Sequence, residues 1–472
     1  MQRRSLVIVL LILISTIPAM SRRVMENLDR GVIARCSGSS VFINWRLFGT
    51  DPAEIGFNLY RQRSGGGPVL VCTTGSDEGT NCKDNEGREG DVYFVRTLLD
   101  DVEGEPNRPH TYNGKDYLSI HLKSHDGAIH FAWAGDLDGD GDMDFVVDRL
   151  GASTISVDAY TNDGAFLWRM DMGHNADDRD NIEGGPSVIS NGHWDGLTVF
   201  DFDSDGKAEV AIKTANGVTF GDGTVLNHNN DRDQFVSVVD GITGKELART
   251  ALPDDFISDG PLQAHFSAGY FDGVHPSIVT RCKNRQGSGG FNLVANAWDY
   301  RDGKLTKRWQ WKRGRERNSA DFHQHRVVDV DRDGKDELAD GGYVLDDDGT
   351  FLYGLEGVIH GDRFHITDLD PSRPGLEGFG IQQDNPSGLE TYYYDAADGN
   401  IIRRHSGAGG DLGRRTVLDL YENKTGYEYI SFNGMWVAQT GETITTDGNA
   451  VPWPNFRMWW DGDLGSEHID HN

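Results

Sequence analysis

The strongest signal for the fold is the stretch Asp136-Leu-Asp138-Gly-Asp140-Gly-Asp142-Met-Asp144. Its carboxylates fall at alternate positions, and a glycine stands at position 6, where the chain of a calcium loop must turn sharply. An EF-hand would carry a bidentate glutamate at position 12, but Val147 stands there, and residues 145–147 have the pattern of a strand. The stretch therefore predicts a calcium loop that leads into a β-strand.

Two further stretches of nine residues repeat this register. Their acidic positions are Asp201, Asp203, Asp205 and Glu209 in one, and Asp329, Asp331, Asp333 and Glu337 in the other. Weaker versions are Asp368-Leu-Asp370 with Glu377 and Asp419-Leu-Tyr421 with Glu428. A solvated turn would explain one such loop, but three in the same register predict that the protein binds several Ca²⁺ ions.

The charge balance and the N-terminus predict where the protein works. A net charge of −30 argues against nucleic acids and anionic membranes as partners. Residues 1–21 resemble a secretory signal, with Arg3 and Arg4 before an apolar run from Leu6 to Ile14. The alternative is a membrane anchor, but the run is shorter than the ~20 residues that a span needs. We therefore expect a secreted, extracellular protein without a membrane partner after cleavage.

The cysteines fit an oxidising compartment. Cys72 and Cys82 lie ten residues apart with glycines between them, so a disulfide could close a short hairpin there. Cys36 and Cys282 would have to form a long-range pair, or remain as buried thiols. None of the four has the spacing of a metal ligand or a nucleophile.

Short strands dominate the rest of the chain, and they indicate two parts. Residues 24–110 predict a small antiparallel module, because aromatic and β-branched residues alternate between Gly, Ser and Asp loops. Residues 100–116 are polar and contain two prolines, which indicates a linker or a long loop. From residue 117 onward the calcium loops alternate with hairpins built around Asp-Gly turns. These hairpins are residues 157–168, 239–249, 298–308 and 394–404.

The spacing of these units predicts a β-propeller. A period of about 45–60 residues with four short strands has the size of a propeller blade, so residues 117–460 allow about six or seven blades. An array of β-sandwiches is the alternative fold. In a propeller, each bound Ca²⁺ would tie one acidic loop to the blade below it, so that calcium-binding energy becomes folding energy.

The sequence resembles the rhamnogalacturonan lyases of polysaccharide lyase family 11. The most specific stretch is Thr367-Asp368-Leu-Asp370-Pro371-Ser372-Arg373-Pro374-Gly375-Leu-Glu377. Further stretches that carry the resemblance, in family order, are residues 25–32, 41–51, 57–61, 205–217, 269–277, 329–337, 360–362 and 459–464. The resemblance implies an eight-bladed, calcium-rich propeller over residues 117–472. It also implies β-elimination at rhamnosyl-(1→4)-galacturonate bonds of the pectic polysaccharide rhamnogalacturonan I.

The resemblance also implies a site. Elimination needs a cation to neutralise the uronate carboxylate and a base to remove the C5 proton. In the family, two histidines and two carboxylates are thought to hold the catalytic calcium. The matching positions here are His323, His360 and Asp362, with Gln383 where the family has glutamate. Histidine nitrogen is an unusual ligand for calcium.

Two more residues are candidates for contact with the sugar. Lys213, after the second calcium loop, is predicted to be the base or a clamp for the carboxylate. Asp158 resembles an acidic position implicated in sugar binding, although residues 148–153 depart from the family pattern before it. The family also continues beyond the position of Asn472 with a segment that carries a further lysine. We therefore expect an incomplete last blade.

Two other functions compete with the lyase. A catalytically inactive propeller that binds glycans or proteins through calcium would need no histidine cluster, so His323, His360 and Asp362 favour the enzyme. The hypothesis of a hydrolase with paired carboxylates has less support, because the acidic residues are already spaced for calcium. We expect a monomer.

Overall fold

The structure is a computed structural model, and it shows an all-β protein. It describes residues 23–150, 155–177, 189–190, 196–285, 290–313, 320–383, 387–407, 410, 412, 416–421, 423–451, 456–460, 462–463 and 465–469. Within these residues, the helical structure is two 3₁₀ turns, η1 (Ile257–Asp259) and η2 (Gly448–Ala450). No described helix has the length and apolar character needed to cross a membrane. The predicted signal of residues 1–21 lies outside the described residues.

The N-terminal module consists of two sheets, as the sequence predicts. One sheet has the order β1 (Ile33–Ser37), β2 (Ser40–Asn44), β5 (Asn81–Asp84). The other has the order β4 (Val69–Thr74), β3 (Gly56–Gln62), β6 (Val92–Leu99), β7 (Val102–Pro106), and β8 (His110–Thr111) also pairs with β6. Alternate residues of β3 and β6, such as Leu59 and Val95, are buried in the core of this module.

The predicted disulfide Cys72–Cys82 is confirmed, but its setting differs from a closed hairpin. Cys72 lies on β4 and Cys82 on β5, and these strands belong to different sheets of the module. The bond therefore joins the two layers. Cys36 and Cys282 are not disulfide-bonded; Cys36 is an exposed thiol and Cys282 a buried one.

Six four-stranded antiparallel meanders follow in chain order among the described residues. The first three are β9 (Ala128–Gly135), β10 (Asp144–Leu150), β11 (Ser156–Tyr160), β12 (Phe166–Asp171); β15 (Leu197–Phe200), β16 (Glu209–Ala215), β17 (Gln234–Val239), β18 (Glu246–Ala251); and β19 (Gln263–Gly269), β20 (Ser277–Arg285), β21 (Phe291–Arg301), β22 (Lys304–Lys312). The last three are β24 (Arg326–Val328), β25 (Glu337–Ala339), β26 (Tyr343–Leu345), β27 (Phe351–Gly354); β29 (Phe364–Thr367), β30 (Glu377–Ile381), β31 (Thr391–Asp395), β32 (Ile401–His405); and β33 (Thr416–Leu418), β34 (Glu428–Ser431), β35 (Gly434–Val437), β36 (Thr443–Thr445).

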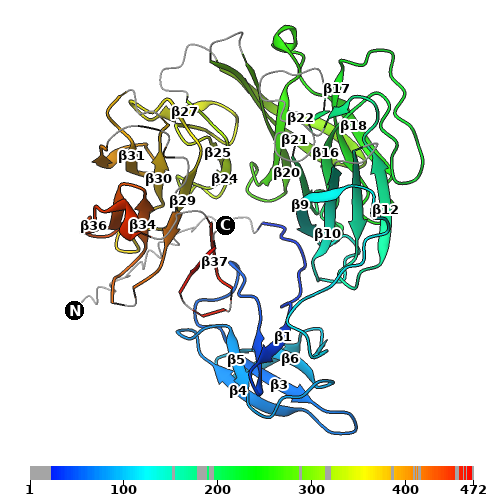
Figure 1. The fold of residues 1–472 in the computed structure, drawn as a ribbon, viewed down its shortest axis with the longest axis vertical. Helices are drawn as coiled ribbons and strands as arrows, with labels where there is room; N and C mark the ends of the chain where they lie inside the picture. The colour runs from blue at the N-terminus through cyan, green and yellow to red at the C-terminus, as the bar shows by residue number, and fades with distance from the viewer. Residues whose placement is uncertain are drawn as a thin grey trace, which may run out of the picture.

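Three two-stranded pairs complete the described strands. They are β13 (Ala176–Asp177) with β14 (Ile189–Ser190), β23 (Asp321–Phe322) with β28 (His360–Gly361), and β37 (Phe456–Met458) with β38 (Glu467–Ile469). The first three meanders and the last three form two groups on either side of β37, and the N-terminal module lies below them in Figure 1.

The predicted Asp-Gly hairpins each join the third and fourth strands of a meander. In all four, the strand register shifts by one residue just before the turn, for example between Ala159 and Tyr160 and between Val238 and Val239. The turn glycine has positive φ, as at Gly164 with φ 90°, a conformation that costs glycine least. Local sequence therefore sets these turns.

The hydrophobic cores lie between consecutive meanders. One cluster joins Val146 and Val157 of the first meander to Val210 and Ile212 of the second, and comparable clusters join the following neighbours. The first strands of successive sheets are also in contact, as for β9 with β15 and β15 with β19. This arrangement is typical of propeller blades. Eight blades and closure of the ring stay predictions.

The acidic loops follow the first strands and lie at one end of the sheets. Neighbouring loops are joined through the backbone: Ala208 N donates to Asp136 O at 2.7 Å, and Tyr427 N donates to Leu369 O at 3.0 Å. Residues 23–29 cross several of these ends. Their contacts are Arg23 with Asp336, Val24 with Val274, Glu26 with Asp201, and Asp29 with Gly141.

Candidate active site and cation-binding loops

His323, His360 and Asp362 converge in the structure, as the sequence predicts. Their ligand atoms lie within 4.8 Å of one another. His323 Nε2 is 3.5 Å from Asp362 Oδ1, and the two imidazole rings are 5.2 Å apart between centroids. All three side chains are half-buried, so the group is accessible to a cation and a substrate.

Parallel pairing of β23 with β28 brings the two histidines together. The register places Asp321 opposite His360 and Phe322 opposite Gly361. A Cβ on Gly361 would lie 2.0 Å from the carbonyl oxygen of Ile381 and 2.6 Å from the Phe322 ring. Only glycine at position 361, between His360 and Asp362, therefore lets β28 lie this close to Phe322 and Ile381.

A buried ion pair fixes the backbone next to His323. Arg281 Nε donates to Asp340 Oδ2 at 2.7 Å, and Arg281 Nη2 donates to the carbonyl of Phe322, also at 2.7 Å. Asp340 Oδ1 accepts the backbone N–H of Phe322 at 2.9 Å. Removing one member would leave a buried charge and unpaired backbone groups, so this pair holds His323 in place.

Asp321 connects His360 to Lys283. The same oxygen, Asp321 Oδ2, lies 3.5 Å from His360 Nδ1 and 3.8 Å from Lys283 Nζ. His360 Nδ1 also contacts the carbonyl oxygen of Asp321 at 2.7 Å. This contact leaves His360 Nε2 as the nitrogen for a cation.

The charges in this cluster separate the pKa values of its members. Burial, together with the neighbouring charge of Arg281, lowers the pKa of Lys283 to about 7. Burial also lowers the pKa of His323 to about 3, helped by the charge of Lys283, so this imidazole is neutral. Burial opposes protonation of His360 as well, but the Asp321 carboxylate outweighs it and raises the pKa of His360.

Arg326 lies within electrostatic range of two other arginines. Arg326 begins β24, three residues after His323, and Arg363 follows Asp362 directly. Burial lowers the pKa of Arg326, and the charges of Arg363 and of Arg457 on β37 lower it further, so these two guanidinium groups repel that of Arg326. In a chain with net charge −30, such a group of cations favours an anionic ligand.

Gln383 lies beside His360, while its neighbour Gln382 is structural. The backbone N–H of Gln383 donates to the carbonyl of His360 at 3.0 Å. The buried side chain of Gln382 accepts from Ile359 N at 2.6 Å and donates to the carbonyls of Gly357 and Leu389. Gln383 is therefore the glutamine that the structure brings next to the histidines.

Lys213 and Asp158, the two predicted sugar contacts, are both buried. Lys213 is buried on β16, and its Nζ donates to the carbonyl of Leu262. Asp158 is buried on β11, where its oxygens bind Arg149 at 3.2 Å and Arg169 at 2.6 Å. The ion-paired carboxylate of Asp158 contributes to packing within the first meander, and the predicted roles of both residues stay predictions.

The sequence reading missed Arg281, Lys283, Asp321 and Asp340. One signal was present: Arg281, Lys283 and Arg285 occupy alternate positions of strand β20, so they project from one face. Asp321 also precedes His323 by two residues. The order of the sheets decides which other residues face Arg281, Lys283 and Arg285. No local sequence pattern specifies that order.

The acidic loops bring together some of the predicted ligands. Groups of carboxylate oxygens within 4.8 Å form in all three loops with the full register: Asp136, Asp138, Asp144; Asp201, Asp203, Glu209; and Asp329, Asp331, Asp333. In the first loop, Asp140 and Asp142 contact Arg108 instead. Asp205 Oδ1 accepts the N–H of Lys207. Among the described residues, Asp368 and Asp370 belong to no such group.

These loops contain carboxylate oxygens that suit a cation. Asp203 Oδ1, Asp329 Oδ1 and Glu337 Oε1 are buried and accept no hydrogen bond. The other oxygen of Glu337 accepts the N–H of Val330 at 2.7 Å. Burial and neighbouring aspartates raise the pKa of Glu209 and of Glu337 to about 9. Carboxylate oxygens are ligands of the type that Ca²⁺ prefers.

We expect calcium to stabilise the fold. Calcium at about 100 times its Kd would add about 2.7 kcal/mol per site to the free energy of unfolding, because it binds only the folded loops. The measurement is the unfolding midpoint by calorimetry as calcium is added. Glu209→Gln should reduce the gain, whereas Asp302→Asn, in an exposed hairpin turn, should not. An unfolding midpoint that does not depend on calcium would contradict this expectation.

Comparisons with known proteins agree with this arrangement. Residues 106–472 match the profile described as "Rhamnogalacturonan lyase family 11, C-terminal domain", and residues 23–112 match "Rhamnogalacturonan I lyases beta-sheet domain". Rhamnogalacturonan endolyase YesW of Bacillus subtilis (strain 168) is 32% identical over 499 residues, which cover 95% of this chain and 76% of that protein. Rhamnogalacturonan exolyase YesX of the same organism is 32% identical over 513 residues, which cover 96% of this chain and 78% of that protein.

A solved structure is similar over the same range. Bacillus licheniformis Rhamnogalacturonan Lyase PL11 has a TM-score of 0.80 and 32% sequence identity, covering 96% of this chain and 80% of that one. The fold and the cluster of histidines and carboxylate thus belong to a polysaccharide lyase. More particularly, the chain belongs to rhamnogalacturonan lyase family 11.

Proposed function

We propose that this protein is a secreted enzyme that cleaves rhamnosyl-(1→4)-galacturonate bonds of rhamnogalacturonan I by calcium-assisted β-elimination. The observation that carries the proposal is the convergence of His323, His360 and Asp362 in front of the Lys283–Asp321 pair. The relatives named above are lyases of rhamnogalacturonan. Secretion is supported by the Cys72–Cys82 bond, since such bonds persist in oxidising compartments.

The reaction requires a base and charge neutralisation. A base takes the proton from C5 of the galacturonate, the electrons of that C–H bond form the C4–C5 double bond, and the C4–O bond breaks. The departing rhamnosyl oxygen then takes a proton. The C5 proton is weakly acidic, because its removal places negative charge next to a carboxylate. When bound, calcium supplies Lewis-acid neutralisation of that carboxylate.

The residues at the site fit a divalent cation, and they restrict how calcium would bind. His323, His360 and Asp362 supply two nitrogen donors and one carboxylate. Calcium prefers six to eight oxygen ligands, so this set leaves positions for the uronate carboxylate and for water. The Gln383 amide next to His360 offers a further oxygen from the protein. The low pKa of His323 keeps its imidazole neutral, so that one ring nitrogen is unprotonated and able to bind metal.

The arginines suit an acidic polymer. Arg363 and Arg457 repel the Arg326 guanidinium, and a bound uronate would relieve that repulsion. Guanidinium groups bind carboxylates through two parallel hydrogen bonds, which orient the sugar as well as hold it. Placement of the galacturonate by these groups would bring its C5 proton to a fixed position against the base.

Lys283 is our candidate for that base, in place of Lys213. Its amine lies next to the Asp321–His360 pair and has a pKa of about 7. A general base works best when its pKa is close to the working pH, because it is then both available and able to accept a proton. Arg281 and Asp340 act as positioning residues through the backbone of Phe322.

The test of the function is the ultraviolet absorbance of the C4–C5 double bond during incubation with rhamnogalacturonan I. We expect absorbance to rise, to stop when EDTA is added, and to resume with calcium. Hydrolysis makes no such double bond. Polymer binding without a rise in absorbance would instead indicate a calcium-dependent binding protein. A rise that is indifferent to EDTA would contradict the role of the cation.

A further inference from the structure

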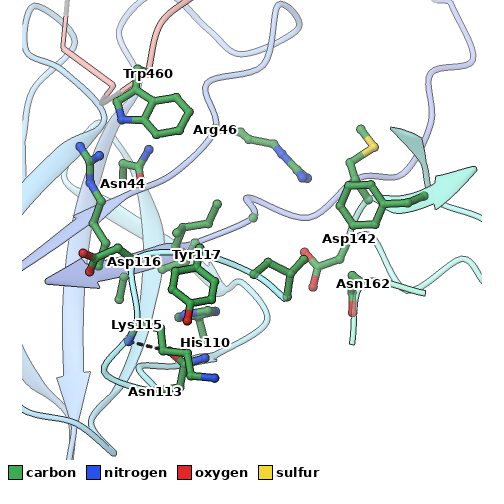
Figure 2. A pocket seen from close by; sticks show the side chains of 18 residues that line it. Asn44, Arg46, His110, Asn113, Lys115, Asp116, Tyr117, Asp142, Asn162 and Trp460 are labelled. Carbon is green, nitrogen blue, oxygen red and sulfur yellow. Dashed lines mark hydrogen bonds between the residues drawn. The ribbon is translucent and has the colours of Figure 1, made fainter. Parts of the chain in front are cut away.

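A cavity lies apart from the histidine cluster, and none of its lining residues belongs to that cluster. It has a volume of about 630 Å³ and opens between the N-terminal module and the first meander. Its walls come from β1, the end of β2, residues 110–118, the first acidic loop and Trp460 (Figure 2). Cavities that hold small ligands or sugar units measure roughly 300–1,000 Å³.

The cavity and the candidate active site lie at opposite ends of the meanders. His323 precedes β24, and Asp329 of an acidic loop follows it, so these residues mark the two ends of a single strand. The cavity contains Asp142 and Met143 of the first acidic loop and therefore lies at the loop end. A ligand in the cavity would not contact the histidine cluster.

Two exposed aromatic side chains face this cavity. Tyr117 is 66% exposed and Trp460 is 57% exposed. The Tyr117 ring stands near the middle of the cavity, and the Trp460 indole lies across from it (Figure 2). Large aromatic rings left open to water indicate a binding surface, since burying them would be favourable. Their flat faces match the C–H face of a sugar ring.

Cations and amides accompany the rings. Lys115 Nζ lies 5.8 Å from the Tyr117 centroid, and the Arg35 guanidinium lies 5.9 Å from Trp460. Within the described part of the chain, neither cation forms an ion pair with a carboxylate. Asn44 and Asn113 also line the cavity and supply amide donors and acceptors.

The carboxylates that line the cavity already have partners. Asp116 Oδ1 accepts the N–H of Cys36 at 3.0 Å, and Asp142 lies 3.3 Å from Arg108. A third cation, Arg46, lines the same cavity and donates to the carbonyl of Asp29 at 2.9 Å. Locally, therefore, positive charge remains available in a chain whose overall charge is strongly negative, and this complements an acidic ligand.

We propose that this cavity is an accessory binding site for a galacturonate-containing segment of the pectic polymer. Sugar rings stack on Tyr117 and Trp460, a uronate carboxylate pairs with Lys115 or Arg35, and Asn44 and Asn113 bind hydroxyl groups. The identity of the polymer rests on the proposed function. The site would hold the enzyme on long chains while a different segment occupies the histidine cluster.

The experiment is electrophoresis in gels that contain polysaccharide, in the His360→Ala background so that the polymer is not cut. We expect rhamnogalacturonan I to retard the protein, and carboxyl-reduced polymer or neutral galactan to retard it much less. Tyr117→Ala with Trp460→Ala should weaken binding at least about tenfold, or ~1.4 kcal/mol. Lys115→Met should weaken binding only to the charged polymer. Thermal unfolding checks that each variant is folded.

The matched control is Trp459→Ala, because Trp459 is 49% exposed next to Trp460 but does not line the cavity. It should bind as the parent does. Unchanged binding of the double variant would overturn the proposal, and so would equal loss in the control or no retardation by any polysaccharide. The last result would point to a protein ligand for this surface.

Activity separates this proposal from the proposed function. In the active chain, the double variant should raise KM for the polymer by about tenfold and leave kcat/KM for short oligosaccharides unchanged. Retardation without lyase activity in the parent would refute the enzyme and leave the accessory site standing. Full lyase activity with unaltered polymer binding in the double variant would refute the accessory site and leave the proposed enzyme standing.

Discussion

His360→Ala is expected to abolish elimination, with a loss of at least about 10³-fold in kcat, since a Lewis acid contributes several kcal/mol to such a transition state. The substitution removes one of three converging donors and breaks the contact between His360 and Asp321. His323→Ala and Asp362→Asn should act in the same direction. The measurement is initial rate by ultraviolet absorbance, together with the number of calcium ions bound per chain.

The control is His275→Ala. His275 also pairs with an aspartate, at 3.2 Å from Asp272, but it lies at the acidic-loop end of the third meander. This variant should keep its activity. The His360→Ala protein should lose one equivalent of calcium and retain the ions of the acidic loops. Full metal content in an inactive His360→Ala protein would show that the histidine acts other than as a ligand.

Lys283→Arg is expected to lower kcat by about 10²–10⁴-fold, the range that a positioned general base contributes. Arginine preserves the positive charge near Asp321 but does not give up its proton in proteins. The wild-type rate should rise with pH through about 7, because only the neutral Lys283 amine accepts a proton. Protonation of His360, whose pKa is raised, would weaken cation binding in the same acid range.

The comparison at alkaline pH separates these two effects. Above about pH 8, the Lys283 amine is mostly neutral in the wild type, so the base is available. Lys283→Arg should remain slow there. A pure positioning role for Lys283 predicts instead that the variant recovers with pH along the wild-type curve. Lys213→Arg is the matched control, since Lys213 is a buried lysine on the second strand of the preceding meander.

Local patterns account for most of the fold that the sequence predicts. Alternating carboxylates with a glycine specify the acidic loops, because ligand spacing and the sharp turn are both local requirements. Each loop then sets the end of a first strand and the start of a second, as Gly135 and Asp144 show. Asp-Gly turns such as Gly164 specify the third and fourth strands. The all-β class and the repeat follow from these signals.

The site was predicted only in part, because its members come from different sheets. Resemblance to a family identified His323, His360 and Asp362, which pairing of β23 with β28 brings together. Lys213 and Lys283 look alike in the sequence, since each lies on the second strand of a meander between one apolar and one polar neighbour. No local property decides which of them faces the histidines.

The sequence by itself determined the β-strands, the loops, their repeat and the family, since each depends on spacings of a few residues. Only the tertiary structure decided that Lys283 meets Asp321, that Asp158 is buried, and that Cys72 and Cys82 join two sheets. The accessory cavity is the clearest case, because Tyr117 and Trp460 come from distant segments. Such contacts depend on how whole sheets pack against one another, and side-chain spacing along the chain does not encode that packing directly.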